Sequence, residues 1–343
     1  DPPSCEEAQP PSQLNFSYFS FFSDLHQPYD VVSTIVETLA ISTVFLVSLA
    51  ANAAAAALVT WERRALANKT ILTLNLFVAD LLFVSTIPVI VAARWTVSWT
   101  LGHNTCHTLL YVICMSGCVT ITTLACISVE RVQAVLQLQA VPTLNSRMVT
   151  GAVIFIWAFS ALTTLPLSLF FTVTEVYVHE QEHLHICTLM WPDTAGEIVW
   201  SVTFSALCFF LPGLVIMISY CKILQTQHRR PTVGGPVEYM ISRQDMRLFR
   251  TLLVLVLSFF IMWSPIFIIT FFILARNFLG YLYVSSTVFF WVVTFTLANS
   301  ALNPILYSVC QFKSHWRRLC CGSAVVPLRG ETFGAPRKQQ IHP

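Results

Sequence analysis

The amino-acid sequence predicts an all-α membrane protein, a bundle of seven transmembrane helices with a short amphipathic eighth helix. Of its 343 residues, 55% are hydrophobic and only 10% are charged, whereas about 25% of the residues in an ordinary soluble domain are charged. Seven apolar stretches are each long enough to cross a hydrocarbon core of about 30 Å, and short polar loops separate them. Neither an inverted nor a parallel repeat is visible, which argues against the common transporter architectures.

The seven predicted spans divide the chain into four parts. We assign residues 1–30 to an N-terminal tail, 31–311 to the membrane domain, 312–321 to the eighth helix and 322–343 to a C-terminal tail. The predicted spans are Val31–Val59, Thr70–Ala93, Cys106–Val129, Met148–Phe171, Ile198–Ile223, Leu248–Leu274 and Tyr283–Val309.

The third span is predicted to be the central helix of the bundle. No charged side chain lies between His107 and Glu130. The middle of the span holds small, weakly polar residues such as Ser116, Gly117 and Thr120, which let neighbouring helices approach closely. A helix that faced lipid on all sides would carry more Leu and Phe.

Basic residues collect on one side of the predicted bundle. By the positive-inside rule that side is cytoplasmic, so we expect a plasma-membrane protein with an extracellular N-terminus. Asn15, in the sequence Asn-Phe-Ser, is then a predicted glycosylation site. The opposite side holds only Arg94 and Arg276, whereas the basic side and the C-terminal tail hold Arg63, Arg64, Lys69, Arg131, Arg147, Lys222, Arg229, Arg230, Arg243, Arg247, Arg250, Lys313, Arg317, Arg318, Arg329, Arg337 and Lys338.

The eleven cysteines sort by their place in the chain. On the predicted extracellular side, a bridge between Cys106 and Cys187 would hold the loop after the fourth span over the bundle, and Cys5 is left over. Cys320 and Cys321 follow the amphipathic run and are predicted palmitoylation sites. The cysteines in or near apolar spans are expected only to pack; they are Cys114, Cys118, Cys126, Cys208, Cys221 and Cys310.

Four motifs stand at specific places in these spans. They are Cys106 at the outer end of the third span, Glu130-Arg131-Val132 at its inner end, Phe259-Phe260-Ile261-Met262-Trp263-Ser264-Pro265 in the sixth, and Asn303-Pro304-Ile305-Leu306-Tyr307 in the seventh. Over nearly its whole length the chain therefore resembles the rhodopsin class of G protein-coupled receptors. The resemblance implies a receptor and no enzyme, with G proteins of the Gq/11 and Gi/o families, arrestin and membrane lipids as partners, and no nucleic acid.

The resemblance also implies a switch at the cytoplasmic end. Glu130 would pair with Arg131 and keep the cytoplasmic mouth closed. On activation the sixth helix would swing outward, and Arg131 would turn toward Tyr220, Tyr307 and the G protein. The alternative is that Arg131 merely anchors its helix at the membrane interface.

Deeper in the bundle, the resemblance assigns roles to residues that composition alone would place in an ordinary core. Ile121, Pro212 and Phe259 match the packing triad of the class. Trp263 matches the floor of the ligand pocket, and Pro304 belongs to the motif of the seventh helix.

Asp80 is an acidic residue in the middle of the second span, where a charge is costly and usually functional. Together with Thr120, Ser300 and Asn303 it resembles the sodium site of the class, so Na⁺ is the one cofactor implied. The alternative is an Asp that is hydrogen-bonded for structural reasons.

Two ligand chemistries of the class are excluded by single positions. The position eighteen residues before Arg131, where amine receptors carry Asp, is Ile113. The position six residues before Asn303, where opsins carry the retinal Lys, is Leu297. The ligand is therefore neither a simple cation nor a Schiff-base chromophore.

Arg94 indicates the chemistry of the ligand, because an Arg fork binds a carboxylate in a bidentate manner. An apolar aromatic slot beside one cation suits an amphiphile with an acidic head and a long hydrocarbon tail. Alternatively, Arg94 could pair with Glu37 or Glu197, or reach toward the membrane interface. The residues predicted to line the slot are Trp99, Tyr111, Trp191, Trp200, Phe204, Trp263 and Phe289.

Within the class, several stretches resemble the receptors for long-chain fatty acids, which implies medium- or long-chain free fatty acids, polyunsaturated ones included, as ligands. A receptor for another lipid or hydrophobic carboxylate is one alternative, and a membrane transporter is another. The matching stretches are Phe21-Phe22-Ser23-Asp24, Ala93-Arg94-Trp95-Thr96, Cys187-Thr188-Leu189-Met190-Trp191-Pro192, Gly196-Glu197-Ile198 and Arg247-Leu248-Phe249-Arg250-Thr251-Leu252.

One motif points to a different chemistry. The run from His179 to His183 reads His-Glu-Gln-Glu-His, the pattern of zinc peptidases. That chemistry needs the two histidines on a helix, a third ligand and a cleft. We expect this run in a loop close to Cys187, so we predict no enzyme.

Overall fold

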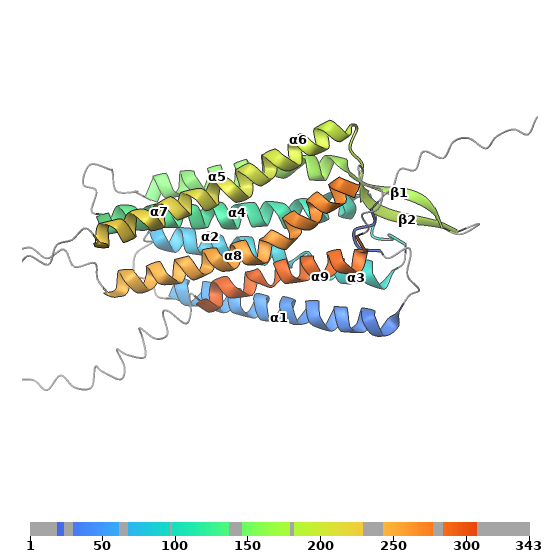
Figure 1. The fold of residues 1–343 in the computed structure, drawn as a ribbon. Helices are drawn as coiled ribbons and strands as arrows, with labels where there is room; N and C mark the ends of the chain where they lie inside the picture. The colour runs from blue at the N-terminus through green and yellow to red at the C-terminus, as the bar shows by residue number, and fades with distance from the viewer. Residues whose placement is uncertain are drawn as a thin grey trace, which may run out of the picture.

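The fold was obtained as a computed structural model, which describes residues 19–23, 30–61, 68–96, 98–136, 146–178, 182–228, 243–276 and 284–306. Among these residues, seven helical spans are long and apolar enough to cross a membrane, and they form one elongated bundle (Figure 1). The predicted fold class is confirmed. The eighth helix at 312–321 lies outside the described residues, as do Asn15, Tyr307, Cys320 and Cys321.

Several spans are built from more than one helical element. The first four spans are α1 (Val31–Trp61), α2 (Asn68–Val84) with α3 (Ile87–Trp95), α4 (His103–Leu136) and α5 (Ser146–Phe170). The last three are α6 (Thr194–Ser205) with the π-helical turn η2 (Ala206–Phe210) and α7 (Leu211–His228), then α8 (Arg243–Arg276), and finally α9 (Ser286–Leu297), after which the chain turns and stays helical to Leu306.

The second span is broken, although its apolar length predicts one continuous helix. Pro88, at the second position of α3, has no backbone N–H to continue the helical ladder. A turn at Ser85 and Thr86 separates α2 from α3. The Thr86 hydroxyl donates to the Phe83 carbonyl at 2.7 Å, which satisfies one acceptor at the break. The break sets the direction of the short helix that carries Arg94.

The fifth span widens in its middle. The turn η2 precedes Pro212, which cannot donate to the preceding turn of the helix. A single π-helical turn inserts one extra residue and rotates the side chains around it. As a result Cys208 and Phe209 are buried in the bundle, next to α4 and α8.

A β-hairpin connects the fourth and fifth spans, where the sequence predicts a loop. Strand β1 (Phe171–Val178) pairs antiparallel with β2 (Glu182–Leu189), with Phe171 opposite Leu189 and Val178 opposite Glu182. β-Branched residues such as Thr172 and Val173 favour this extended backbone. His183 lies on β2 and not on a helix, and the described residues contain no group of three potential metal ligands.

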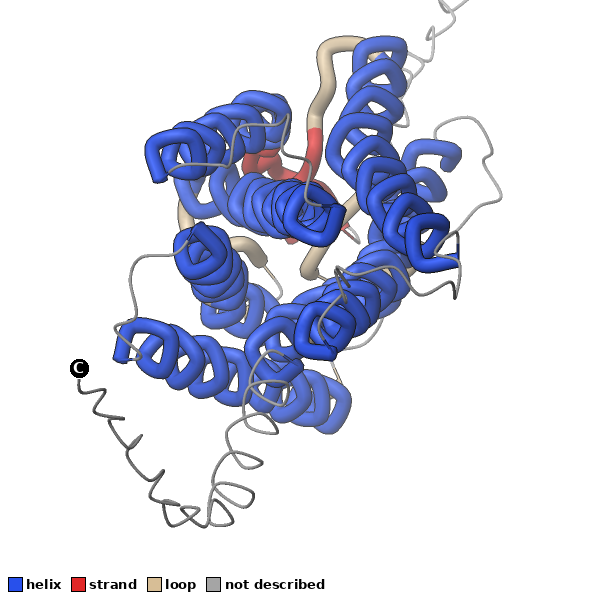
Figure 2. The backbone as a smooth tube through the Cα atoms, turned by 90° about the vertical axis from the view of Figure 1, so that its left-hand side faces the viewer, coloured by secondary structure: helices blue, strands red, loops and turns tan. Residues whose placement is uncertain are grey.

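Helix α4 lies at the centre of the bundle, as predicted, and contacts α2, α5, α7 and α8. Figure 2 looks along the bundle from the end opposite the hairpin. The side chains of Ile121 and Leu124 are fully buried. Asn75 of α2 donates to the Thr123 hydroxyl at 2.8 Å and accepts from the Trp157 indole at 2.8 Å, so one polar chain joins α2, α4 and α5.

Candidate ligand-binding site

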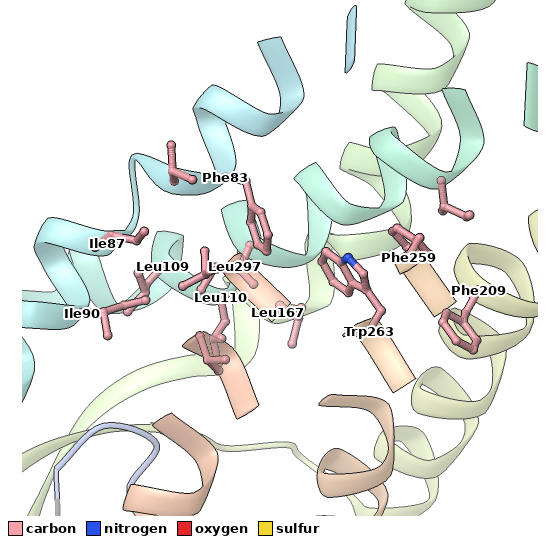
Figure 3. Packing of buried hydrophobic residues seen from close by; sticks show 14 of the residues in the cluster. Phe83, Ile87, Ile90, Leu109, Leu110, Leu167, Phe209, Phe259, Trp263 and Leu297 are labelled. Atoms are coloured by element: carbon pink, nitrogen blue, oxygen red, sulfur yellow. The ribbon is translucent and has the colours of Figure 1, made fainter. Parts of the chain in front are cut away.

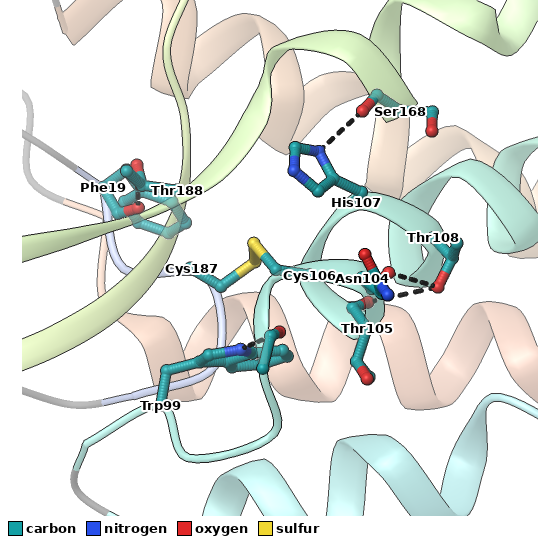
Figure 4. The surroundings of a disulfide bond; sticks show 11 residues. Phe19, Trp99, Asn104, Thr105, Cys106, His107, Thr108, Ser168, Cys187 and Thr188 are labelled. Atoms are coloured by element: carbon teal, nitrogen blue, oxygen red, sulfur yellow. Dashed lines mark hydrogen bonds between the residues drawn. A yellow bond between two sulfur atoms is a disulfide. The ribbon is translucent and has the colours of Figure 1, made fainter.

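The hairpin is fixed over one end of the bundle by a disulfide bond. Cys106 at the start of α4 is bonded to Cys187 of β2, with the two Cα atoms 5.7 Å apart (Figure 4). The backbone N–H of Trp99 donates to the His185 carbonyl at 2.7 Å, and the Trp99 indole donates to the Gly102 carbonyl at 2.9 Å. The predicted bridge is confirmed, and Trp99 supports the base of the hairpin.

Residues 19–23 form a buried segment beneath the hairpin, which we call the N-terminal strap. The Thr188 hydroxyl donates to the Phe19 carbonyl at 2.9 Å. The Ser286 hydroxyl at the start of α9 contacts the carbonyls of Ser20 and Ser23. The strap therefore joins β2 to the beginning of the seventh span.

Aromatic packing holds the N-terminal strap in place. The rings of Phe19, Phe21 and Phe22 lie 5.8, 5.1 and 5.6 Å from the ring of Phe289. Phe21 also packs against Phe171 at 4.9 Å. Phe289, predicted to line a ligand slot, is thus covered by the strap, and no pattern in the sequence predicts this cover.

Arg94 forms a bidentate ion pair with Glu37. Its Nε and Nη2 atoms donate to the two carboxylate oxygens at 2.8 and 2.9 Å, and its Nη1 donates to the Phe22 carbonyl at 3.0 Å. The two side chains are only 9% and 1% exposed. Of the alternatives raised by the sequence, the pairing with Glu37 is the arrangement in the structure.

The pair connects several elements at this end of the bundle. Arg94 is on α3 and Glu37 on α1, the Phe22 carbonyl belongs to the N-terminal strap, and Thr287 of α9 lies 3.5 Å from Nη2. The guanidinium also stands over the Phe290 ring at 5.3 Å. Glu37 occupies the Nε and Nη2 donors of Arg94, so a ligand carboxylate that uses these two donors has to exchange with Glu37. The predicted direct contact with a ligand is untested and stays a prediction.

A continuous row of aromatic rings descends from the hairpin along the fifth and sixth spans. We call the row Trp191, Trp200, Phe204, Phe267 and Phe209 the aromatic ladder. Its successive ring centroids are 5.6, 5.0, 6.1 and 4.6 Å apart. Three of the residues predicted to bind ligand, Trp191, Trp200 and Phe204, are brought together here.

Polar atoms along the aromatic ladder are few. The Trp200 indole donates to the Thr163 carbonyl at 3.1 Å, whereas the buried Trp191 indole nitrogen has no hydrogen-bond partner among the described residues. The Tyr111 hydroxyl donates weakly toward the Ala161 carbonyl at 3.5 Å, which orients this predicted ligand residue toward α5. The ladder is therefore an apolar surface with one spare donor near the hairpin.

Trp263 lies beneath the ladder in a stack of three rings. Its indole is sandwiched between Phe83 at 5.3 Å and Phe259 at 5.2 Å (Figure 3), and Phe209 of the ladder lies 6.3 Å from Phe259. Gly117 of α4 faces the same indole, so a Cβ at this position would overlap the ring. A change in the packing of the ladder can thus be transmitted to Trp263 through Phe259.

Two members of the predicted triad, Ile121 and Phe259, share one buried cluster with Trp263. Ile121 of α4 is fully buried and Pro212 of α7 is buried. Phe259 is also fully buried and links the triad to Trp263. Their roles in switching are untested by the structure and stay predictions.

Asp80 lies in a buried polar cluster below Trp263. Its carboxylate accepts a hydrogen bond from the Asn303 amide at 2.8 Å. The Ser300 hydroxyl instead contacts the Ser48 hydroxyl at 2.9 Å and the Leu297 carbonyl at 2.7 Å, and Thr120 is buried. Among the described residues, the polar atoms without a hydrogen-bond partner include Ser116 Oγ, Trp263 Nε1, Asn299 Oδ1 and Asn303 Oδ1.

At the opposite end of the bundle, Arg131 lies beside Glu130. The closest nitrogen and oxygen atoms of this pair are 3.8 Å apart, which is a loose contact for an ion pair. Tyr220 is half-buried and Pro304 is buried. The predicted partner Tyr307 lies outside the described residues.

Comparison with known proteins gives the class. The protein family described as "7 transmembrane receptor (rhodopsin family)" matches residues 51–307 of the chain. The chain belongs to this family of G protein-coupled receptors: it is a multi-pass plasma-membrane receptor that binds a ligand and couples to G proteins, and it is not an enzyme.

Individual relatives narrow the comparison. Free fatty acid receptor 4 of Rattus norvegicus is 46% identical over 332 residues, which cover 94% of this chain and 91% of the rat protein. Free fatty acid receptor 4 of Mus musculus is 45% identical over 346 residues, covering 96% and 95%. Somatostatin receptor type 5 of Rattus norvegicus is 32% identical over 257 residues, covering 72% and 67%.

Proposed function

We propose that this protein is a receptor for medium- and long-chain free fatty acids, including polyunsaturated ones. The aromatic ladder carries the proposal, because five rings form a continuous apolar surface from the hairpin toward Trp263. Each buried CH₂ group contributes about 0.8 kcal/mol, so a long tail can supply most of the affinity. The rat and mouse relatives named as free fatty acid receptors support the same ligand class.

The unsaturated members of this class suit the ladder for a further reason. The rings of Trp200 and Phe204 are nearly parallel, with an angle of 14° between their planes. A planar double bond presents a flat face to such rings, as aromatic partners do. A bent chain can also follow the row from Phe204 to Phe267 and Phe209.

We assign the head group to Arg94 through exchange with Glu37. A fatty acid in the bilayer is favoured as the neutral acid, since an apolar medium disfavours the carboxylate. On arrival it gives its proton to Glu37 and its carboxylate takes the place of the Glu37 carboxylate on the guanidinium. The net charge of the buried site is unchanged, so no unpaired charge is left in the bundle.

The signal then passes from the ladder to the opposite end. Movement of Phe209 changes the packing of Phe259 and Trp263. The cytoplasmic end of α8 then swings outward and opens the bundle beside Arg131, so that Arg131 can contact the G protein. We propose Gq/11 and Gi/o proteins and arrestin as partners on that side. The N-terminus is then extracellular, with a glycan on Asn15, and palmitoylation falls on Cys320 and Cys321.

We also propose that Na⁺ stabilises the resting receptor at Asp80. The side-chain oxygens that would hold it belong to Asp80, Asn303 and the neighbouring Thr120 and Ser300. The unpartnered Asn303 Oδ1 is the observation that fits a cation, because hard cations prefer oxygen ligands. A bound Na⁺ would supply a positive charge that offsets the buried carboxylate.

G protein activation in membranes that contain the receptor tests the proposal directly. The membranes are exposed to saturated and polyunsaturated acids of increasing length, with separate Gq/11 and Gi/o sensors. Activation that strengthens with tail length is the expected result. The absence of any response, with measured transport of the acid instead, would contradict a receptor, and activation only by other hydrophobic carboxylates would replace the ligand class.

A further inference from the structure

Three thiols gather on the side of α4 that faces the fifth span. Cys114 and Cys118 are one helical turn apart on α4, and Cys208 is on the π-helical turn η2. All three are free cysteines. The Cys118 thiol donates to the Cys208 sulfur, and the two sulfurs are only 2.9 Å apart. Their position in apolar spans predicts only packing.

The pair lies directly behind the aromatic ladder. Cys118 and Cys208 share one buried cluster with Phe204, and Trp200 and Phe267 pack against it. The two helices that carry the sulfurs therefore form a wall of the surface along which we have placed the ligand tail.

The surroundings of the pair contain hydroxyl groups as well as rings. The Cys208 thiol lies 3.5 Å from the Thr163 hydroxyl, which in turn donates to the Phe159 carbonyl at 2.9 Å. The hydroxyls of Thr122 and Ser160 also lie near Cys118. The two thiols therefore lie among hydroxyl groups as well as aromatic rings.

We infer that Cys118 and Cys208 are an oxidation-sensitive dithiol that closes to a disulfide within the bundle. A disulfide needs about 2.05 Å between its sulfurs, so these two atoms have to approach by less than about 1 Å. We expect rotation of the two side chains to supply this short approach. Both residues are buried, which restricts the oxidant to a small neutral peroxide.

The reaction balances with hydrogen peroxide as the oxidant. One sulfur attacks a peroxide oxygen, the O–O bond breaks, and the departing oxygen leaves as water with the proton of that thiol. The second thiol then attacks the sulfenic acid, the S–O bond breaks, the S–S bond forms and a second water leaves. The two thiols are oxidised by two electrons and one peroxide is reduced to two waters.

The disulfide would join α4 to η2. Because η2 follows α6, the helix that carries Trp200 and Phe204, the bond fixes part of the aromatic ladder against the central helix. The aromatic ladder can then no longer rearrange around a fatty-acid tail, so G protein activation by the acid is reduced. This consequence rests on the proposed function, whereas formation of the disulfide does not.

The test uses full-length receptor in native membranes treated with hydrogen peroxide. Remaining thiols are blocked with N-ethylmaleimide, and the protein is digested without reduction for mass spectrometry. The expected product is a cross-linked peptide pair that contains Cys118 and Cys208 and is two hydrogens lighter than the two thiol peptides. Recovery of both residues only as N-ethylmaleimide adducts, or a bridge that uses Cys114 instead, would overturn the inference.

Signalling supplies a second, separate readout. Peroxide should reduce the fatty-acid response of the wild type and of Cys126→Ser, a control two turns along α4, but not that of Cys118→Ser or Cys208→Ser. An equal loss in all four proteins would overturn the proposed effect on the ladder. If no fatty acid activates any of them, the proposed function fails, while the mass measurement still decides whether the disulfide forms.

Discussion

Arg94 and Glu37 form a buried bidentate ion pair between α3 and α1, and the same guanidinium holds the Phe22 carbonyl of the N-terminal strap. Breaking a buried pair by removing one partner usually costs about 3–5 kcal/mol, because the other charge is left uncompensated. The pair can therefore serve as a clamp, as a site where a ligand carboxylate replaces Glu37, or as both in turn.

Glu37→Gln separates these roles. If the ligand exchanges with Glu37, the variant lacks the competing carboxylate, so the fatty acid should keep or gain potency and should stabilise the receptor more than it stabilises the wild type. The measurements are G protein activation and thermal stability with and without the acid, normalised to surface expression. A loss of potency equal to that of Arg94→Gln would show that the pair acts only as a clamp.

Removal of the disulfide between Cys106 and Cys187 should disable the receptor. Cys106→Ala or Cys187→Ala frees the hairpin, which holds the N-terminal strap through Thr188 and precedes Trp191. We expect surface expression or the ligand response to be lost in each variant, as cell-surface labelling and G protein assays can measure. Wild-type behaviour of both variants would remove the hairpin from the site.

Gly117→Ala should raise signalling in the absence of ligand. The added methyl group overlaps the Trp263 indole, which then has to leave its stack with Phe83 and Phe259. Basal G protein activity at matched expression measures the effect. Gly151→Ala is the control, because nothing lies within 4 Å of a Cβ at that helical position. Unchanged basal activity in Gly117→Ala would argue against Trp263 as part of the switch.

Arg131→Ala should uncouple ligand binding from signalling. Arg131 lies at the end of the bundle opposite the hairpin, beside Glu130, and far along α4 from the aromatic ladder. We expect retained fatty-acid binding, measured by displacement of a labelled ligand, with loss of G protein activation. Full signalling by a well-expressed variant would mean that Arg131 only anchors its helix.

Much of the fold follows from local sequence properties. Apolar length predicted the seven spans, and the small residues near Gly117 predicted the central place of α4. Cys106 and Cys187 were both assigned to the extracellular side of the membrane, which predicted a disulfide bond between them. The structure contains this bond. Each of these predictions depends on residues close together in the chain or on a property of a whole segment.

Features that depend on distant contacts were not predictable in the same way. Ser286 contacts the N-terminal strap, although more than 260 residues separate them in the sequence. No periodicity in residues 19–23 predicts this contact. The sequence left open whether Arg94 holds a ligand carboxylate, pairs with Glu37 or Glu197, or reaches toward the membrane interface, because the packing of the helices decides between these arrangements. Pro88 and Pro212 were local signals for the break in the second span and the widened turn η2.

The central claim, that Arg94 receives the carboxylate of a fatty acid, is tested most directly by comparing an acid with its methyl ester on the wild type and on Arg94→Gln. A lost charge-assisted contact costs about 1.5–3 kcal/mol, or about ten- to a hundredfold in potency. We predict that the ester is weaker than the acid by this factor on the wild type and that the two are nearly equal on Arg94→Gln. Equal potency of acid and ester on the wild type would contradict the account.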